Sequence, residues 1–552
     1  MDGRARGASA PREAEDIPGS VGFWRWAPWL LISFALAVGI GIWEVFPVGI
    51  WHDDGVYVLL AKALAQGEGL RYVGVSGAPL APKFPPLFPL LLSFVWRIFP
   101  SFPDNVPILA GVNLALTTAA AGLFFRYGER GLEIPPPVAL GAGALVWMSA
   151  HLWRVAAIHL SEPLFLLTLL LALWAGARME KRPGPGPVLG FLLLGGLATY
   201  ARTLGVAVLG AGVVVLFLRG RRKASLGAAS GTLALLLPWW LWTRRAAETI
   251  PDPLKDTLGS YTEWLASQVR TQPQEFADFL WRNVGSLLGR TSGLVLPGLS
   301  GGWMILGLIV IPFLVLGLVD LYERSRILVF TLLFSYGILL VWPFLDVRLM
   351  VPFQPLLVLA VVMGFRRVWV SSASPDRLRV PVIGVALAWA VLFGSTNGAR
   401  LASGWVGDSY RIRSSALRDA VATVSERTPL DAVIGAPELW SGIHLYSGRT
   451  VAPSARFRPL SGDDPVEGTP AEQVQLWIQA GITHLLLEHG GLVNGEALNR
   501  VDAACPAGTV MILDSSDGQL LVSLNWDREC QERALASLAL SGGLTVDQGE
   551  GD

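Results

Sequence analysis

The chain has few charged residues and only two cysteines, and these shortages exclude several kinds of protein. Asp, Glu, Lys and Arg make up 16% of its 552 residues, whereas soluble domains carry about 25%. Cys505 and Cys530 form no CxxC pair, which excludes a zinc ribbon and a disulfide-dense scaffold. The sequence also lacks a Walker loop, GxSxG, HExxH and a dinucleotide fingerprint. The signatures of many soluble enzymes are therefore missing.

Hydrophobic residues are abundant instead, at 52% of the chain, and the mean hydropathy is +0.49. A membrane-spanning helix needs roughly 20 apolar residues. The first apolar run is too long for a cleavable signal and lacks a small-residue cleavage site, so we expect a retained first helix. The sequence predicts eleven spans, at about 26–46, 106–125, 136–153, 162–177, 187–200, 204–218, 225–243, 303–319, 327–343, 349–365 and 379–394.

The distribution of Lys and Arg predicts how these spans are oriented, because cytoplasmic loops carry an excess of both. With a cytoplasmic N-terminus and eleven spans, all the basic clusters fall inside. If the apolar segment 85–100 were a further span, every later cluster would change sides, so we expect a surface or partly inserted helix there. The clusters are Arg4/Arg6/Arg12/Arg25, Arg126/Arg130, Arg178/Lys181/Arg182, Arg219/Arg221/Arg222/Lys223, Arg324/Arg326 and Arg366/Arg367/Arg377/Arg379.

The same count divides the chain into three parts. Residues 1–25 form a cytoplasmic tail, and residues 26–394 form a transmembrane domain with outer loops 47–105 and 244–302. Residues 395–552 return to soluble composition and alternate helical with short apolar strand patterns, which predicts an extracytoplasmic α/β domain. Its two cysteines form a disulfide or remain free and buried. Loop 244–302 does not interleave basic and aromatic residues, so no nucleic-acid partner is expected.

Two polar groups in the first outer loop are candidates for chemistry. Asp53 and Asp54 lie just beyond the first span, where a carboxylate can act as a general base or hold a divalent cation. The alternative is a solvated loop in which Asp54 caps a helix that starts near Gly55. Lys83 precedes a rigid double proline and can meet a phosphate. Alternatively, it extends towards lipid head groups.

Three further residues are expected at the outer ends of spans. Glu162 begins the fourth span, with His159 nearby, and is either functional or a favourable first-turn glutamate. Arg202 and Arg348 lie on the side where few positive charges are expected. A guanidinium binds phosphate oxygens bidentately. Each arginine is otherwise a partner for a carboxylate, such as Asp346 for Arg348.

The order of these short motifs along the chain is more specific for a protein family than any single motif. An outer loop with an acidic pair is followed by K-aromatic-P-P, then S-E-P, T-x-x-R-T-L-G and D-x-R-x-x-x-P-x-x-P. This order resembles the GT-C superfamily of membrane glycosyltransferases, over residues 25–395. The chain is similar to bacterial members related to protein O-mannosyltransferases (glycosyltransferase family 39) and lipid A aminoarabinose transferase. The soluble tail resembles the outer C-terminal domain that many of these proteins carry.

The resemblance implies transfer of a sugar from a polyprenyl-phosphate carrier to an unknown acceptor at the outer face of the cell membrane. The first-loop base maps onto Asp53, within an Asp-Asp pair where relatives often have Asp-Glu, so Asp54 stays a candidate. The second acidic residue maps onto Glu162, and Lys83 matches the motif lysine. Arg202 and Arg348 are candidates for the carrier phosphate. A metal held by Asp53, Glu162 and His159 is a further option.

Two other classes of function remain open at this point. A transporter or lipid flippase would place charges near span midpoints and carry paired broken helices, whereas the charges here are expected at span ends. A catalytically inert membrane relative would tolerate the loss of Asp53 and Glu162. The sequence does not name the sugar, the acceptor or the length of the carrier.

Overall fold

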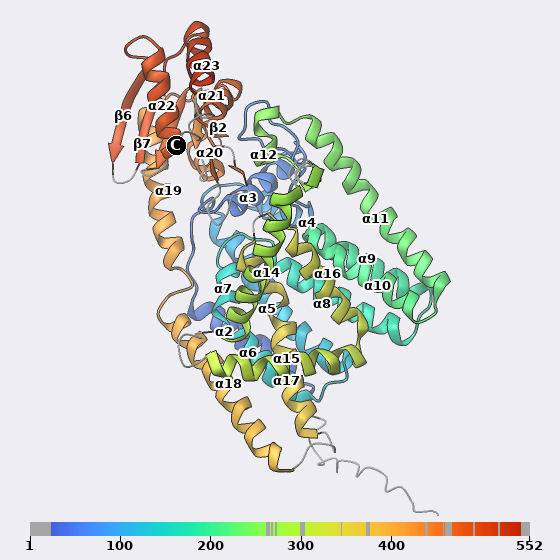
Figure 1. Cartoon of the computed structure of the whole chain (residues 1–552). Helices are drawn as coiled ribbons and strands as arrows, with labels where there is room; N and C mark the ends of the chain where they lie inside the picture. Colours follow the sequence, from blue (N-terminus) through green and yellow to red (C-terminus); the bar gives the residue numbers. More distant parts are fainter. Residues whose placement is uncertain are drawn as a thin grey trace, which may run out of the picture.

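The computed structural model is mostly helical, and its described residues cover nearly all of the predicted spans. It describes residues 22–542, apart from gaps at 23, 261–264, 267–268, 271–272, 298–303, 344, 371–375, 437–439, 456, 459–465, 468, 489–491 and 517–518. Residues 1–21 of the predicted cytoplasmic tail, with Arg4, Arg6 and Arg12, lie outside the described residues. Figure 1 shows a bundle of helices below and the C-terminal part above it.

Each of the eleven predicted spans coincides with a helix or with a pair of helices. By length and composition, five described helical segments can cross a membrane: Val106–Gly131, Glu162–Lys181, Arg222–Glu248, Val347–Val370 and Arg379–Ala402. A sixth is the pair α6 and α7, bent by 61°. The count of eleven spans therefore stays a prediction. The bundle helices are α2 (Ala27–Gly41), α5 (Val106–Arg126), α6 (Pro136–Trp147), α7 (Ala150–Ala156), α8 (Glu162–Lys181), α9 (Pro185–Ala201), α10 (Val206–Leu218), α11 (Arg222–Glu248), α15 (Met304–Arg324), α16 (Arg326–Leu340), α17 (Gln354–Val370) and α18 (Asp376–Ala402).

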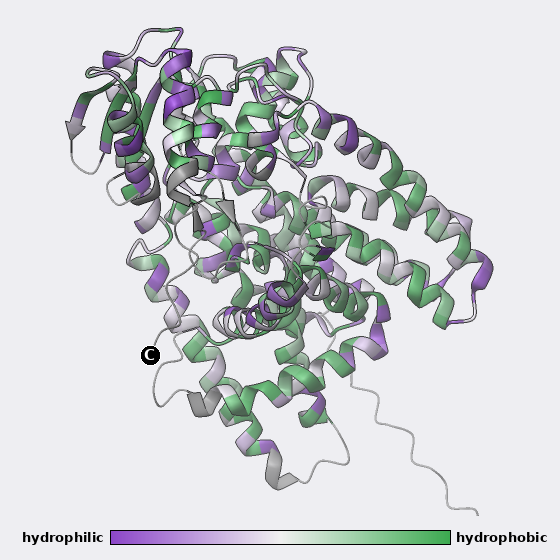
Figure 2. Cartoon of the chain, turned by 45° about the horizontal axis from the view of Figure 1, so that its top comes forward, coloured by the Kyte–Doolittle hydropathy of each residue, from purple (hydrophilic) through white to green (hydrophobic). Residues whose placement is uncertain are grey.

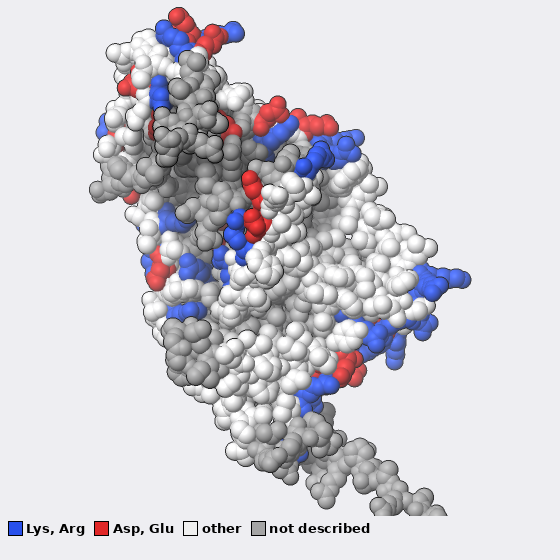
Figure 3. Space-filling model, viewed as in Figure 1, with Lys and Arg blue, Asp and Glu red and all other residues white. Residues whose placement is uncertain are grey.

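Several of the predicted cytoplasmic clusters meet at one end of the bundle. Lys181 Nζ lies 2.6 Å from a carboxylate oxygen of Glu133, and the Arg324 guanidinium donates to the Glu133 carbonyl. Next to Lys181, Glu180 pairs with Arg219. Figure 3 shows Lys and Arg gathered low on the molecule, below a broad uncharged surface. This grouping is what the positive-inside argument requires, and the orientation in the membrane remains a prediction.

Two helices of the predicted outer loops pack against the bundle without spanning it. Helix α4 (Leu87–Ile98) has 12 residues, which is short for a spanning helix, and it packs on α3 (His52–Ala65). This agrees with the expectation that segment 85–100 is not a full span. Helix α14 (Pro273–Val295) lies against α16 and α17. Its Asn283 side chain donates to the carbonyls of Leu340 and Trp342.

The C-terminal part is built around a five-stranded sheet of order β2-β1-β5-β7-β6. Pairing is parallel from β2 through β5 and antiparallel in β5-β7-β6. Figure 2 shows more hydrophilic residues here than on the bundle helices. Cys505 and Cys530 form a disulfide. The elements are α19 (Asp408–Arg427), β1 (Val433–Ala436), α20 (Trp440–Ser447), β2 (Thr450–Pro453), β3 (Phe457–Arg458), β4 (Val466–Glu467), α21 (Pro470–Gln479), β5 (His484–Glu488), α22 (Leu492–Ala504), β6 (Val510–Ser516), β7 (Gln519–Leu524) and α23 (Arg528–Gly542).

Glycines allow α20 to lie directly on the start of α3. A Cβ atom on Gly49 would collide with the backbone of Gly442, and one on Gly55 would collide with Ser441 Oγ. The backbone N–H of Val48 donates to the hydroxyl of a residue in α20, Tyr446, at 3.1 Å. This α3–α20 contact fixes the start of α3 beneath the C-terminal part, and the candidate site lies at its edge.

Candidate functional site

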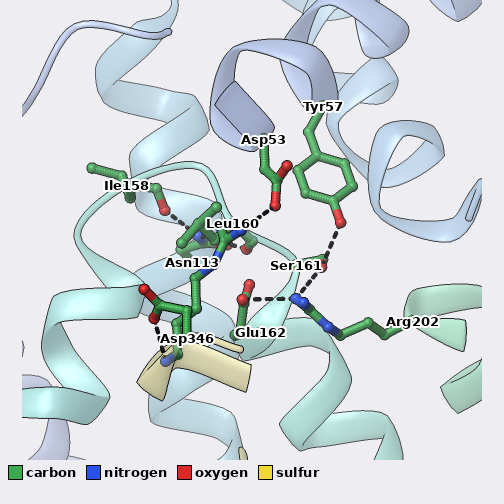
Figure 4. Close-up of polar contacts among 10 residues, drawn as sticks. Asp53, Tyr57, Asn113, Ile158, Leu160, Ser161, Glu162, Arg202 and Asp346 are labelled. Carbon is green, nitrogen blue, oxygen red and sulfur yellow. Dashed lines mark hydrogen bonds and ion pairs between the residues drawn. The ribbon is translucent and has the colours of Figure 1, made fainter. Parts of the chain in front are cut away.

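Two ion pairs form the centre of the candidate site (Figure 4). Arg348 Nη2 lies 2.6 Å from Asp53 Oδ2, and the two side chains are 25% and 16% exposed. Arg202 Nη1 lies 2.7 Å from Glu162 Oε1, with Glu162 only 1% exposed. The structure therefore brings together four of the predicted site residues, which are up to 295 positions apart in the sequence.

Each of these side chains lies at the end of a helix, which explains how they meet. Asp53 is in the first turn of α3 and Glu162 is the first residue of α8, where a negative charge interacts favourably with the helix dipole. Arg202 follows the last residue of α9 in an extended conformation. Arg348 lies in a short 3₁₀ turn, Val347–Leu349, before α17.

The structure also answers which carboxylate pairs with Arg348. Asp346 accepts a hydrogen bond from the backbone N–H of Arg348 at 2.7 Å and so caps the 3₁₀ turn. The guanidinium itself points away from this turn and pairs with Asp53. Asp346 thus holds the backbone in place while the side chain is directed to the site.

A second set of contacts joins the Arg202–Glu162 pair to α3, and its members were not among the predicted site residues. The Tyr57 hydroxyl lies 2.8 Å from Ser161 Oγ, which also accepts a hydrogen bond from Arg202 at 3.3 Å. Asn113 Nδ2 donates to the carbonyls of Ile158 and Leu160 and holds the loop that precedes Glu162. Tyr57 lies one helical turn after Asp53, so the spacing was the available signal.

Asp54 faces away from this group and stabilises its own loop. Its two oxygens accept hydrogen bonds from the backbone N–H groups of Gly49 and Trp51, both at 2.8 Å. The Asp54 side chain is fully buried, and this burial raises its pKa to about 7 in spite of the backbone hydrogen bonds. Asp54 stabilises the start of α3 by accepting these hydrogen bonds from the backbone that precedes the helix. The helix begins at His52 rather than near Gly55.

The ionisation of Asp53 is different because cations surround it. Burial opposes its charged form, but Arg348 first, then His52, Lys83 and Arg202, outweigh burial and lower the pKa of Asp53 to about 2. The adjacent carboxyl groups therefore have pKa values far apart. Such a difference is typical of pairs in which the two groups have different roles.

Lys83 and His52 border the same space. Lys83 Nζ donates to the carbonyl of Thr257 at 3.1 Å, and burial lowers its pKa to about 8 although Asp53 acts in the opposite direction. His52 Nδ1 accepts a hydrogen bond from Trp440 Nε1 of α20 at 3.1 Å. Burial, followed by the Lys83 charge, lowers the pKa of His52 to about 4, so the ring is neutral at physiological pH.

The residues suggested as metal ligands do not form a metal site. Within the part of the chain that the structure describes, no three His, Cys, Asp or Glu side chains are grouped as metal ligands. His159 is therefore not brought together with Asp53 and Glu162 in such a group. Both carboxylates pair with arginines, so this arrangement does not fit a bound divalent cation.

The site combines cations that suit an oxyanion with a carboxylate that suits a hydroxyl. Arg202, Arg348 and Lys83 carry positive charge, and arginine binds phosphate in two parallel hydrogen bonds. Asp53 stays ionised and is partly exposed, so a proton-donating ligand can reach it. Groups that suit a phosphate and a group that suits a hydroxyl thus lie side by side.

Comparison with known proteins shows which solved structures have a similar fold. No family model matches the chain, and no curated protein sequence matches it. The structure of ArnT from Cupriavidus metallidurans in the apo state aligns with a TM-score of 0.53 at 13% identity over 92% of this chain and 98% of that one. The apo oligosaccharyltransferase from Archaeoglobus fulgidus aligns with a TM-score of 0.50 at 12% identity over 84% and 70%. ArnT has also been solved bound to undecaprenyl phosphate (TM-score 0.49, 13% identity, 92% and 99%). The chain thus has the GT-C fold, which confirms the predicted resemblance at the level of fold.

Proposed function

We propose that the chain is an integral membrane glycosyltransferase that moves a sugar from a polyprenyl-phosphate carrier to a hydroxyl acceptor at the extracytoplasmic face. The ion pair between Asp53 and Arg348 carries this proposal. It brings a carboxylate and a guanidinium, the groups to which we assign the roles of base and phosphate ligand, into direct contact at the end of the bundle. A carrier with an apolar tail stays in the bilayer, so its phosphate must be handled at such a boundary.

The reaction we propose is a displacement at the anomeric carbon of the donor sugar. The acceptor oxygen forms a bond to this carbon while the bond from the carbon to the phosphate oxygen breaks, with inversion. Asp53 takes the acceptor proton, since a hydroxyl is a poor nucleophile without a base. Arg348 and Lys83 stabilise the negative charge that remains on the carrier phosphate.

The ion pair also links donor binding to the strength of the base. In the structure, Arg348 helps hold the pKa of Asp53 at about 2, which is low for a general base. A donor phosphate would compete for Arg348, and the pKa of Asp53 would rise towards its usual range. The base would therefore become stronger when the donor is present.

Glu162 and Arg202 have a positioning role in the proposed mechanism. Their pair, with Tyr57 and Ser161, positions Arg202 beside the donor phosphate. The buried Glu162 carboxylate keeps that arginine in a fixed direction. In this arrangement Glu162 positions a cation rather than binding a metal.

Features of the whole chain and of its structural neighbour support the same reaction class. The described apolar helices are suited to a membrane, and the basic clusters gather at the end of the bundle where Glu180 lies. Helix α8 carries Glu162 and Glu180 at its two ends, so its rise of about 1.5 Å per residue separates them by roughly 27 Å. ArnT, which shares the fold, binds undecaprenyl phosphate. We assign residues 395–552 to the outer side, above the site.

Sugar transfer by membranes that contain the full chain tests this function directly. Radiolabelled polyprenyl-phosphate sugars would be supplied to wild type and to Asp53→Asn at matched expression. We expect transfer by wild type and its loss in the variant. Transfer that persists in Asp53→Asn would contradict the mechanism. No transfer from any donor by wild type would favour a transporter or an inert relative.

A further inference from the structure

The hydrogen bond between Trp440 and His52 fixes which nitrogen of the histidine ring carries the proton. An indole N–H is a donor only, and a neutral imidazole has one donor nitrogen and one acceptor nitrogen. Trp440 Nε1 donates to His52 Nδ1 at 3.1 Å, so Nδ1 is the acceptor. Because burial lowers the pKa of His52 to about 4, the ring carries a single proton at neutral pH. That proton is therefore on Nε2.

The Nε2–H group of His52 is a hydrogen-bond donor that the described part of the chain does not use. Among the described residues, His52 forms its hydrogen bond through Nδ1, and Nε2 has no acceptor. Both ring nitrogens of His159 are unpaired and fully enclosed, whereas Nε2 of the partly exposed His52 is not among the atoms enclosed in this way. A donor that is held in one tautomer and has no acceptor is suited to bind an oxygen atom of a ligand.

The surroundings of His52 place this donor near both ends of the proposed reaction. His52 directly precedes Asp53 in the first turn of α3, and the charges of Lys83, Asp53 and Arg348 all act on its ring. In the proposed displacement, the sugar lies between the phosphate oxygen that leaves and the hydroxyl oxygen that attacks. A group close to both cations and to the base is therefore close to the sugar.

The neutral charge of the ring indicates which kind of oxygen it suits. Lys83 and Arg348 already offer charged donors, which bind a phosphate oxygen about twice as strongly as a neutral donor does. The neutral N–H of His52 suits an uncharged hydroxyl instead. The rings of Phe84 and Trp440 flank the imidazole, with centroids 6.4 and 5.6 Å away. In such apolar surroundings a hydrogen bond is stronger than in water.

We propose that His52 binds a hydroxyl group of the transferred sugar through Nε2–H, and that Trp440 is the positioning residue that keeps the proton on this nitrogen. The C-terminal part thereby contributes to sugar recognition through a residue of α3. The contact with the sugar rests on the proposed function, whereas the fixed tautomer rests on the Trp440 hydrogen bond alone.

Solid-state nitrogen NMR of the full chain in lipid bilayers, with isotope-labelled histidine, tests the tautomer without a substrate. The spectrum of His52→Gln identifies the His52 signals. At neutral pH we expect a neutral ring protonated on Nε2, and a mixture of both neutral tautomers in Trp440→Phe. Trp281→Phe, on α14 at a position that is 78% exposed, is the matched control and should leave the signals unchanged. A proton on Nδ1 in the wild type, or an unchanged tautomer in Trp440→Phe, would overturn the inference.

Two substitutions of His52 separate sugar binding from packing. The amide oxygen of Asn is bonded to Cγ, as Nδ1 is, so His52→Asn can still accept from Trp440 but has no donor at the position of Nε2. The amide nitrogen of Gln lies one bond further out, so His52→Gln keeps the donor and loses this acceptor. We expect His52→Asn to lower kcat/KM for sugar transfer roughly three- to tenfold, the effect of one neutral hydrogen bond, and His52→Gln to retain most of the activity. The reverse order would show a packing role and overturn the inference.

Donors that lack one hydroxyl group identify the bound oxygen and separate this inference from the proposed function. The radiolabelled polyprenyl-phosphate sugar that wild type transfers fastest would be compared with its monodeoxy analogues. We expect one analogue to react roughly three- to tenfold more slowly with wild type and to cause no further loss in His52→Asn, because both changes remove the same hydrogen bond. Additive losses for every analogue would overturn the sugar contact while the proposed function stands. If wild type transfers no sugar, the proposed function and the sugar contact are both overturned.

Discussion

Replacement of each carboxyl of the Asp53-Asp54 pair by an amide should have opposite effects on activity and on stability. Asp53 contacts Arg348 and remains partly exposed. Asp54 is buried and accepts two backbone hydrogen bonds. We therefore expect Asp53→Asn to lower kcat, and Asp54→Asn to lower the free energy of unfolding with kcat changed less than threefold.

The two magnitudes follow from these contacts. A general base contributes about 10²–10⁴-fold to a rate, so Asp53→Asn should raise the activation free energy by about 3–5 kcal/mol. Its amide oxygen still accepts from Arg348, which limits the loss of stability. In Asp54→Asn one buried N–H of the loop faces an amide NH₂ and loses its acceptor. This loss costs about 1–3 kcal/mol.

The assay combines single-turnover sugar transfer with thermal unfolding of the same purified samples. Rates are compared per folded molecule, so a loss of stability is not mistaken for a loss of catalysis. The reasoning is refuted if Asp54→Asn abolishes transfer in a folded chain while Asp53→Asn retains it. The roles of the two neighbouring carboxyl groups would then be exchanged.

Three other perturbations test different parts of the structure. Gly55→Ala should lower the unfolding temperature and the transfer rate, since its Cβ would collide with Ser441 Oγ in the α3–α20 contact. Removal of the Cys505–Cys530 disulfide, which closes 25 residues, should cost the C-terminal part about 3.5 kcal/mol, measured by denaturant unfolding with and without reductant. Because the pKa of Asp54 is raised to about 7, the folded chain binds its proton more tightly than the unfolded chain does. This contribution to stability is complete below about pH 4 and is lost as the pH rises through 7, which thermal shifts from pH 4 to 8 would measure.

Each of these tests has a matched control or a contradicting result. Gly111→Ala adds a Cβ where nothing lies within 4 Å, so it should leave unfolding and transfer unchanged. Equal unfolding of the reduced and oxidised chains would contradict the disulfide prediction. A pH dependence that persists in Asp54→Asn would assign the effect to another group.

The sequence predicts the members of the candidate site better than their contacts. Asp53, Glu162, Arg202 and Arg348 were recognisable because each stands at the end of a predicted span, and such ends meet at one boundary. The partner of Arg348 was not predictable, because Asp346 is two residues away in sequence whereas the observed partner is 295 residues away. Proximity in the sequence favours Asp346 as the partner of Arg348. Only the packing of the bundle brings Asp53 close to Arg348.

In the C-terminal part, too, the local elements could be predicted from the sequence but their long-range contacts could not. Residues 395–552 contain the mixture of helices and short strands that their alternating apolar patterns predicted. Strand β2 is hard to recognise from its sequence because it is short and ends in proline, which cannot donate a backbone hydrogen bond. The contact of α20 with α3 could not be predicted at all, because it depends on glycines in two segments about 390 residues apart.

The α3–α20 contact has a consequence for how the protein matures in the cell. Trp440 donates to His52 across 388 residues, so the start of α3 gains this contact only after residue 440 has been synthesised. Until then, the backbone around Gly49 and Gly55 has no partner on that side. The growing chain therefore passes through a stage in which the helices of the bundle are present but His52, next to Asp53, still lacks its hydrogen bond from Trp440.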